Sequence, residues 1–270
     1  MRSEYLQHNI FRSDSTPQSA SPQPSLPSPQ SPAPLAVEIR GLRKAYGRVA
    51  VLRDLELDLP WGEVLAVLGP NGSGKTTLIS IIATLARADR GTVRVAGVDH
   101  SRMGEHVRRL IGVVTHEPLL YDDLTAYENL RFVARMFRLD RAEERIAALA
   151  ERLGVAARLH QRVGTLSHGL RKRFTIARAL LHDPAILLMD EPESGLDLEA
   201  QAILTAIIRD RAGPVKAVMM TTHSMERAIA VGDRLAILSR GRIVHQGPLD
   251  SEAGVDSIKE TYARHTGAAS

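Results

Sequence analysis

A short glycine-rich segment limits what this chain can fold into more than any other feature. Residues 69–77 read Gly-Pro-Asn-Gly-Ser-Gly-Lys-Thr-Thr, and they follow the apolar run 64–68. That run predicts a buried strand, and the residues after the segment can begin a helix. Glycines let the backbone wrap closely around phosphate oxygens, so that amide N–H groups and the positive end of the helix face the anion. The segment therefore predicts a phosphate-binding loop and a nucleoside triphosphate as its ligand.

Two side chains of this loop have separate predicted roles. Lys75 is expected to reach the β- and γ-phosphates, and the Thr76 hydroxyl to ligate Mg²⁺. The alternative is a glycine-rich turn that precedes a helix by chance, and the strand–loop–helix context disfavours it. The candidate nucleotide-binding residues of the loop are Gly69, Pro70, Asn71, Gly72, Ser73, Gly74, Lys75, Thr76 and Thr77.

Composition sets outer limits on the protein class. The 270 residues suffice for one large α/β domain or two small ones. The absence of cysteine excludes disulfides, a thiolate nucleophile and Cys-ligated metals, which suits a cytoplasmic protein. No apolar stretch approaches the roughly 20 residues that span a bilayer, so any spans would come from other chains. The net charge of +4 comes mostly from dispersed arginines, which are more often solvated or paired than bound to nucleic acid.

The segment 15–34 differs in kind from the rest of the chain. It holds seven of the fourteen prolines, with Ser and Gln between them and almost nothing apolar to bury. Such a segment cannot offset its ordering entropy, so we expect residues 1–34 to form a disordered or polyproline-like tail. It lacks the apolar core of a signal peptide.

From residue 35 onward, strand-like and helix-like patterns alternate. Residues 44–47 are expected to join the first two strands, and 241–247 to form a closing hairpin. Helices are expected from about 126 to 153, in two pieces broken near Asp140, and from 170 to 181. This alternation favours a mostly parallel sheet covered on both faces. The expected strands are 36–40, 49–59, 64–68, 92–95, 185–189, 217–221 and 234–238.

Two carboxylates end the strand-like run 185–189. In a fold with a phosphate-binding loop, such a strand is expected beside the strand that precedes the loop, so Asp190 would arrive near the Mg²⁺. Glu191 would accept a proton from the water that attacks the γ-phosphate. The alternative is that Asp-Glu-Pro only caps a helix.

Two further polar residues belong to the candidate site. Ser167 has the chemistry of a helix N-cap, and its hydroxyl with the free N–H groups could form a second anion site, although capping alone is the default for an isolated Ser. His223 ends a predicted strand at the carboxyl edge of the sheet, where phosphates bind, which favours a functional histidine over a structural one.

In this order, these segments resemble the ATP-binding subunit of ABC transporters over residues 36–250. The resemblance implies that Tyr46 stacks on adenine, that Glu191 is the catalytic glutamate and that His223 contacts the γ-phosphate. Asp197 corresponds to the D-loop aspartate. In the family two such domains face each other head to tail, so Ser167 and Gly169 of the signature motif would contact the γ-phosphate held by the other copy.

Two positions depart from the family pattern. The usual Gln before the helical subdomain falls at His116, whose imidazole is a poorer Mg²⁺ ligand than a carbonyl oxygen. His116 is nevertheless kept as a candidate metal contact. The signature's usual Gly-Gly-Gln reads His168-Gly169-Leu170, which retains the phosphate-binding Ser167 and Gly169.

The expected fold class is therefore α/β: a P-loop NTPase of ABC type with a mostly parallel core, an antiparallel β subdomain and an inserted helical subdomain. We expect the ATP-binding domain at 35–250, the helical subdomain at about 117–182, and a C-terminal helix and tail at 251–270. The expected ligands are ATP and Mg²⁺. The expected partners are a second ABC domain and a separate transmembrane permease, with the chain on the inner face of the cell membrane and not inserted in it.

At a finer level, His116 and the residues up to Asn129 are similar to the ATPase of the bacterial cytochrome c-biogenesis haem exporter (CcmA family). Haem is therefore one expected cargo, and drug, antibiotic or polysaccharide exporters are the alternative. Soluble ABC ATPases that act on nucleic acid or ribosomes are a further class, but they usually carry paired domains, long coiled coils or a zinc module. A P-loop kinase or small GTPase does not need the signature motif.

The segment from His116 to Asn129 corresponds to the place where a permease docks in that family. It contains a small apolar cluster that a soluble monomer would rarely expose without a partner. Tyr121 and Leu124 are expected to pack against the permease. The cluster consists of Leu119, Leu120, Tyr121 and Leu124.

Overall fold

The structure is a computed structural model that describes residues 35–99, 105–211, 213, 215–249 and 254–266. The tail expected at 1–34 lies outside the described residues. So do 251–253 and 267–270 of the expected C-terminal segment, within which helix α8 covers Gly254–Thr266.

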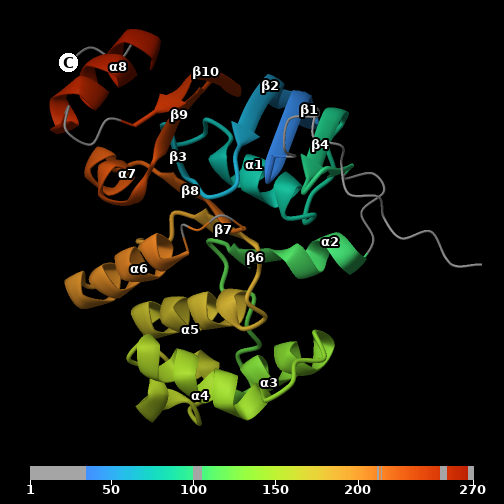
Figure 1. The fold of residues 1–270 in the computed structure, drawn as a ribbon, viewed down its shortest axis with the longest axis vertical. Coiled ribbons are helices and arrows are strands. Elements are labelled where there is room, and N and C mark those ends of the chain that lie inside the picture. Colours follow the sequence, from blue (N-terminus) through green and yellow to red (C-terminus); the bar gives the residue numbers. More distant parts are fainter. Residues whose placement is uncertain (1–34, 100–104, 212, 214, 250–253, 267–270) are drawn as a thin grey trace, which may run out of the picture. The chain divides into compact units, whose positions relative to one another are not determined.

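A six-stranded sheet, in the order β10-β9-β3-β8-β7-β6, forms the centre of the fold (Figure 1). Each neighbouring pair from β9 to β6 is parallel, and only β10 runs antiparallel to β9. Because parallel strands end at the same edge, the loops after β3, β7 and β8 meet there. The strands are β3 (Val64–Leu68), β6 (Ile111–Val114), β7 (Ile186–Asp190), β8 (Ala217–Thr222), β9 (Arg234–Ser239) and β10 (Arg242–Pro248).

A second, antiparallel sheet has the order β2-β1-β4-β5. Its strands are β1 (Val37–Tyr46), β2 (Val49–Leu59), β4 (Arg90–Val95) and β5 (Val98–Asp99). Together the two sheets and their helices confirm the predicted α/β architecture, with a mostly parallel core sheet and an antiparallel β subdomain.

Side-chain alternation along the buried strands divides the core into two clusters. On β3, Leu65 and Val67 pack with helix α1 (Lys75–Ile82) and the antiparallel sheet. Val64, Ala66 and Leu68 lie in the other cluster, with the helices of the opposite face. Every residue of β3 is buried, which explains why the strand is a continuous apolar run and does not alternate with polar residues.

Between β6 and β7 the described chain forms only helical elements, and these pack on one another (Figure 1). Helix α3 (Ala126–Met136) begins at a capping box, in which the Thr125 hydroxyl accepts from the Glu128 N–H while the Glu128 carboxylate accepts from the Thr125 N–H. Helices α4 (Ala142–Arg152) and α5 (His168–Leu180) follow. The break between α3 and α4 falls where the sequence predicted it, near Asp140.

Four other helices complete the described chain, and none of its helices is long and apolar enough to cross a membrane. Helix α2 precedes β6, and α6 and α7 alternate with β7, β8 and β9. Their bounds are α2 (Glu105–Leu110), α6 (Leu198–Asp210), α7 (Met225–Val231) and α8 (Gly254–Thr266).

Three details differ from the sequence-based expectations. The strand that ends at Asp190 is not beside β3, because β8 lies between β3 and β7. Strand β1 continues through Tyr46, so residues 44–46 are paired with β2 and do not form a loop. Strand β6 was not predicted, because four residues, one of them Gly112, give too short a pattern to detect.

A half-buried histidine connects the end of α5 to strand β6. The His182 ring stacks on Phe137, with centroids 4.0 Å apart, and its Nε2 lies 3.1 Å from the Ile111 carbonyl oxygen. Since a carbonyl only accepts, Nε2 carries the proton. Nδ1 is buried and has no partner among the described residues, so a second proton there would be unpaired. Burial lowers the pKa of His182 to about 4, against the opposing effect of the Ile111 carbonyl.

Because the pKa of His182 is lowered in the folded chain, we expect the protein to lose stability in mild acid. The unfolded chain binds a proton below pH 6.5 and the folded chain only near pH 4, so stability falls as the pH drops through this window. Between pH 7 and pH 5 the group contributes a loss of about 2 kcal/mol. His182→Gln keeps an N–H donor for Ile111 but does not titrate. Between pH 7 and pH 5 its free energy of unfolding, measured in urea, should therefore fall by about 2 kcal/mol less than that of the wild type.

The exposed His160 offers a matched control. His160→Gln should follow the wild-type dependence of unfolding free energy on pH. Parallel curves for the wild type and His182→Gln would contradict the assignment.

Candidate functional site

Two glycines of the segment 69–77 let the backbone pass close to its neighbours. Gly74 has φ +110°, and a Cβ there would lie 2.7 Å from the Leu52 side chain. A Cβ at Gly69 would lie 2.5 Å from the Leu238 carbonyl oxygen. Only glycine fits at these positions without displacing neighbours. Gly74 is also the N-cap of α1, so the free N–H groups of the first turn of α1 begin directly at the loop.

A pocket of about 410 Å³ lies over the beginning of α1. It is lined by residues of the loop and the first turn of α1, by one residue of β2 and by the residue after β7. Pro70 and Ser73 instead line a neighbouring pocket of about 290 Å³ beside Tyr262 of α8. The residues that line the larger pocket are Val51, Asn71, Gly72, Gly74, Lys75, Thr76, Thr77 and Glu191.

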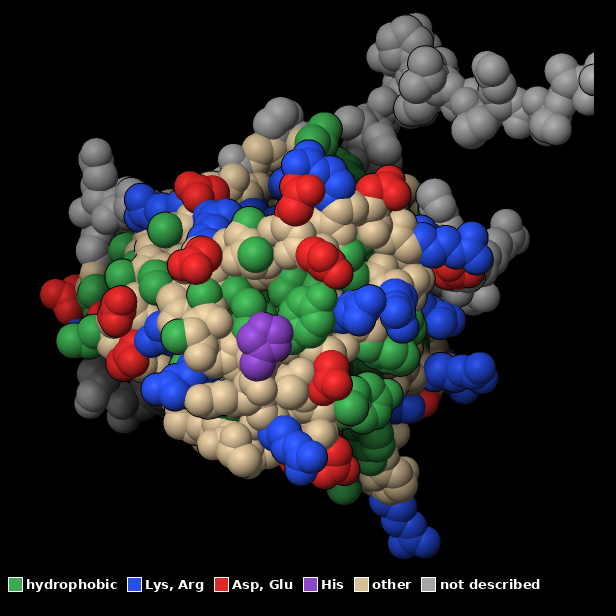
Figure 2. Space-filling view, turned by 90° about the horizontal axis from the view of Figure 1, so that it is seen from below, with side chains coloured by type: hydrophobic (Ala, Val, Ile, Leu, Met, Phe, Trp, Pro, Cys, Tyr) green, Lys and Arg blue, Asp and Glu red, His purple; other side chains and the backbone are tan. Residues whose placement is uncertain are grey.

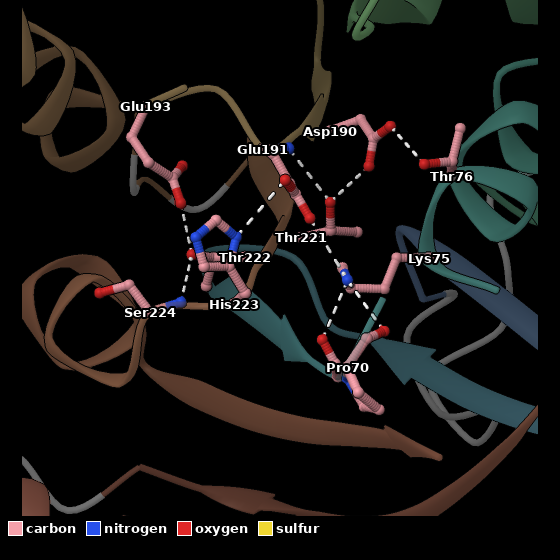
Figure 3. Close-up of polar contacts among 11 residues, drawn as sticks. Pro70, Lys75, Thr76, Asp190, Glu191, Glu193, Thr221, Thr222, His223 and Ser224 are labelled. Carbon is pink, nitrogen blue, oxygen red and sulfur yellow. Dashed lines mark hydrogen bonds and ion pairs between the residues drawn. The ribbon is translucent and has the colours of Figure 1, made fainter. Parts of the chain in front are cut away.

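Lys75 is buried at the base of this pocket. Its ammonium donates to the Gly69 carbonyl at 2.9 Å and to the Pro70 carbonyl at 3.3 Å, and lies 3.3 Å from Glu191 Oε1 (Figure 3). A buried cation held this way suits a multiply charged anion, because the carbonyls fix the ammonium without neutralising it.

Asp190 joins the loop side of the site to strand β8. Its Oδ2 accepts from the Thr76 hydroxyl at 2.7 Å, and its Oδ1 accepts from the Thr221 hydroxyl at 2.6 Å (Figure 3). Asp190 therefore meets Thr76 as expected, although β8 and not β7 is the neighbour of β3. Thr221 lies on β8, the strand between β3 and β7, and its hydroxyl holds Asp190 in place. The sequence did not indicate this role.

Glu191 lies between the two cationic or protonatable side chains of the site. Its Oε1 faces Lys75, and its Oε2 is 3.4 Å from His223 Nδ1. Its backbone N–H is directed to Thr221, at 3.2 Å from both the carbonyl and the hydroxyl oxygen. Its φ of +43° is uncommon for a side chain of this size. The Glu191 backbone is thus turned to point its carboxylate into the pocket.

The predicted signature residues lie at the beginning of α5. Ser167 is the N-cap, and its hydroxyl accepts from the Leu170 N–H at 3.3 Å. Neither Ser167 nor Gly169 is among the described residues that line the larger pocket. His168 packs on Gly195, where a Cβ would lie 2.1 Å from the imidazole.

Asp197 caps α6 through a 2.8 Å bond from the Ala200 N–H. Both of its oxygens also lie 2.9 Å from Arg173 of α5. The Ala200 N–H, followed by Arg173, lowers the pKa of Asp197. The contact between Arg173 and Asp197 therefore holds the segment after β7 against α5 of the same chain.

Two predicted residues lie apart from these contacts. Tyr46 is exposed, with the Lys44 ammonium 5.2 Å from its ring centroid, on the hairpin that also supplies Val51 to the pocket. His116 is exposed, and its imidazole has no hydrogen-bond partner among the described residues. The Thr115 carbonyl, next to it in the chain, accepts from the buried Lys172 at 3.4 Å.

The oxygen atoms of Thr76 and Asp190 fit a magnesium ion. Both are hard donors, and they meet beside the phosphate-binding loop. The described residues contain no group of three or more His, Asp or Glu side chains that could hold a metal. Mg²⁺ is usually bound by one or two protein oxygens together with water and substrate phosphates, so the two oxygens of Thr76 and Asp190 suit it.

Comparison with known proteins agrees with this geometry. A family model described as ABC transporter matches residues 52–194. The chain is 38% identical to the ABC transporter ATP-binding protein NatA of Bacillus subtilis (75% of this chain, 84% of that protein). It is 35% identical to the Nod factor export ATP-binding protein I of Burkholderia orbicola (83% and 75%). The solved structure of a dimeric ATP-binding cassette in a post-hydrolysis state, with ADP and Pi bound, superposes with a TM-score of 0.74 at 26% identity (79% and 99%).

The position of Lys75 predicts that Lys75→Ala removes triphosphate binding, because the pocket loses its buried cation. Fluorescent ATP-analogue binding checks this. Lys216→Ala, which removes a half-buried lysine paired with Asp183 outside the pocket, is the matched control and should bind normally. Unchanged affinity in Lys75→Ala would show that the loop N–H groups suffice.

Proposed function

The chain belongs to the ABC transporter family and is an ABC-type ATPase, and from this premise we propose that two copies of it drive an exporter through a separate membrane-spanning subunit. In this proposal the protein lies on the cytoplasmic face of the cell membrane. The observation that carries it is the carboxylate of Glu191, held between Lys75 and His223 at the edge of the phosphate pocket.

We propose Glu191 as the general base of hydrolysis. Water attacks the γ-phosphorus of ATP and gives its proton to Glu191, while the bond to the β–γ bridging oxygen breaks and ADP leaves. Lys75 stabilises the negative charge on the β- and γ-oxygens, and His223 orients the γ-phosphate. When bound at Thr76 and Asp190, Mg²⁺ neutralises phosphate charge. A role for His116 at the metal stays a prediction.

A second copy of the chain would complete each site. Ser167, Gly169 and the free N–H groups of the first turn of α5 form an anion-binding end that does not line its own chain's pocket. Facing the pocket of another copy, this end would meet the γ-phosphate. Tyr46 is exposed, which leaves it accessible for stacking on adenine.

An apolar patch near α3 supports a membrane-spanning partner. Leu119 and Tyr121 are exposed as predicted, whereas Leu120 packs on the core and Leu124 is partly buried. Tyr121 meets Phe132 edge to face, with ring centroids 5.9 Å apart. Hydrophobic side chains reach the surface among charges of both signs on the side of the molecule shown in Figure 2. We define the patch as Leu119, Tyr121, Phe132 and Met136, all exposed.

The names of the relatives bear on the cargo. Neither relative described above is named for haem, and one is named for Nod factor export. An exporter is therefore favoured, while haem stays a prediction that rests on the segment from His116 to Asn129. Export of a drug, antibiotic or polysaccharide is the alternative. A soluble ABC ATPase acting on nucleic acid or ribosomes would leave the apolar patch without an explanation.

Glu191→Gln should bind ATP but not hydrolyse it, because an amide cannot accept the proton of the attacking water. The trapped ATP should then hold two copies together through Ser167. Phosphate release and light scattering with and without Mg-ATP measure the two effects. A fully active Glu191→Gln protein would mean that another group is the base. A variant that stays monomeric with ATP, even with the membrane partner present, would refute the shared site.

Tyr121→Glu should weaken membrane association, because it places a charge in the apolar patch. ATPase activity of the purified protein should change by less than about twofold, since the patch is separate from the pocket. Leu85→Glu, at an exposed leucine outside the patch, is the matched control. Equal membrane association of the two variants would exclude this docking surface.

Deletion of the gene in the native host tests the cargo separately. Failure of c-type cytochromes to mature would support haem. Normal c-type cytochromes would exclude haem and leave the ATPase assignment unchanged.

A further inference from the structure

A carboxylate outside the predicted site contacts the residue that precedes His223. Glu193, three residues beyond β7, accepts through Oε1 a short hydrogen bond from the Thr222 hydroxyl. Thr222 is fully buried, and its hydroxyl also accepts from the Ser224 N–H at 3.0 Å. Figure 3 shows Glu193 and Ser224 on the far side of His223 from Lys75. The side chain of the residue before His223 and the backbone N–H of the residue after it are therefore both fixed by hydrogen bonds.

We propose that Glu193 is a positioning residue for His223. Through Thr222 and the Ser224 amide, its carboxylate fixes the turn between β8 and α7, and so sets the distance from the imidazole to Glu191. The proposal rests on the role of His223 given above. It adds a residue that touches neither the phosphate pocket nor the predicted metal ligands.

The partial burial of Glu193 supports a specific function. Its Oε2 is buried and has no hydrogen-bond partner among the described residues, which is costly for a carboxylate. A carboxylate that only filled space would be better replaced by an apolar side chain. The hydrogen bond from the Thr222 hydroxyl to Oε1 is thus the contact that explains a carboxylate at this position, although its unpaired Oε2 lowers the stability of the fold.

A buried ammonium offsets part of this cost. Lys172 of α5 is 5% exposed, and burial lowers its pKa while Asp190, Glu193 and Glu191 favour its charged form. Lys172 forms no ion pair with any described residue, so it acts on these carboxylates at longer range through its electrostatic field. The Thr222 hydroxyl therefore donates to a carboxylate that has a buried positive charge nearby.

The first test compares variants that keep or lose the acceptor. Glu193→Ala should lower kcat about tenfold while the KM for ATP changes by less than about twofold, because the ATP-binding loop is untouched. Glu193→Gln keeps an acceptor oxygen and should recover most of the lost rate. Thr222→Val, which is isosteric but cannot donate, should resemble Glu193→Ala, and Thr222→Ser should resemble the wild type. Glu151→Ala, at an exposed carboxylate on α4, is the control.

The second test asks whether Glu193 acts through the histidine. In a His223→Ala background, Glu193→Ala should cause no further loss of kcat, because the positioned group is already gone. Losses that multiply would mean that Glu193 acts independently of His223, and would overturn the proposal. A wild-type kcat in His223→Ala itself would instead refute the role of His223, so the two failures are distinguishable.

A third measurement needs no turnover. The ring-proton NMR signal of His223, assigned by its absence in His223→Ala, should shift or broaden in Glu193→Ala and Thr222→Val. It should keep its position in Glu193→Gln, Thr222→Ser and Glu151→Ala. A signal that is the same in all of these proteins would overturn the proposal, even if the thermal stability of the variants falls.

Discussion

Asp190 is 2% exposed, and each of its carboxylate oxygens accepts a hydroxyl hydrogen bond, from Thr76 and from Thr221. A buried carboxylate needs such partners, because burial without them costs several kcal/mol. Here the partners come from the beginning of α1 and the end of β8, so three segments distant in sequence are held at one edge of the sheet. The orientation of Glu191 follows, since its N–H is fixed by the same Thr221.

The two-sided core makes this edge rigid. Strands β3, β7 and β8 are buried on both faces, and their alternate side chains belong to two different hydrophobic clusters. A shift of any of these strands by one residue would exchange the side chains of the two clusters. The register of β7 on β8 therefore pairs Asp190 with Thr221, close enough for their side chains to form a hydrogen bond.

The sequence predicted the elements that carry strong periodicity and the loop that carries its own chemistry. The strand 64–68, the break near Asp140 and the Ser167 cap occur as expected. Strand order was not predictable, because apolar strands of similar composition fit either position, and the expected pairing of β7 with β3 was wrong. The contacts of Thr221, Glu193 and Lys172 escaped detection because each is made with a residue distant in the sequence, whereas a motif records only neighbours along the chain.

His168 and Gly195 illustrate a constraint on how such a chain can change over time. The imidazole occupies the space that any side chain at 195 would need, and the φ of +76° at Gly195 is a second obstacle. A larger residue at 195 would therefore require the exposed His168 side chain to turn away, and it would still adopt a backbone conformation that favours glycine. Substitutions at the two positions are therefore coupled by a steric contact between the first residue of α5 and the segment that follows β7.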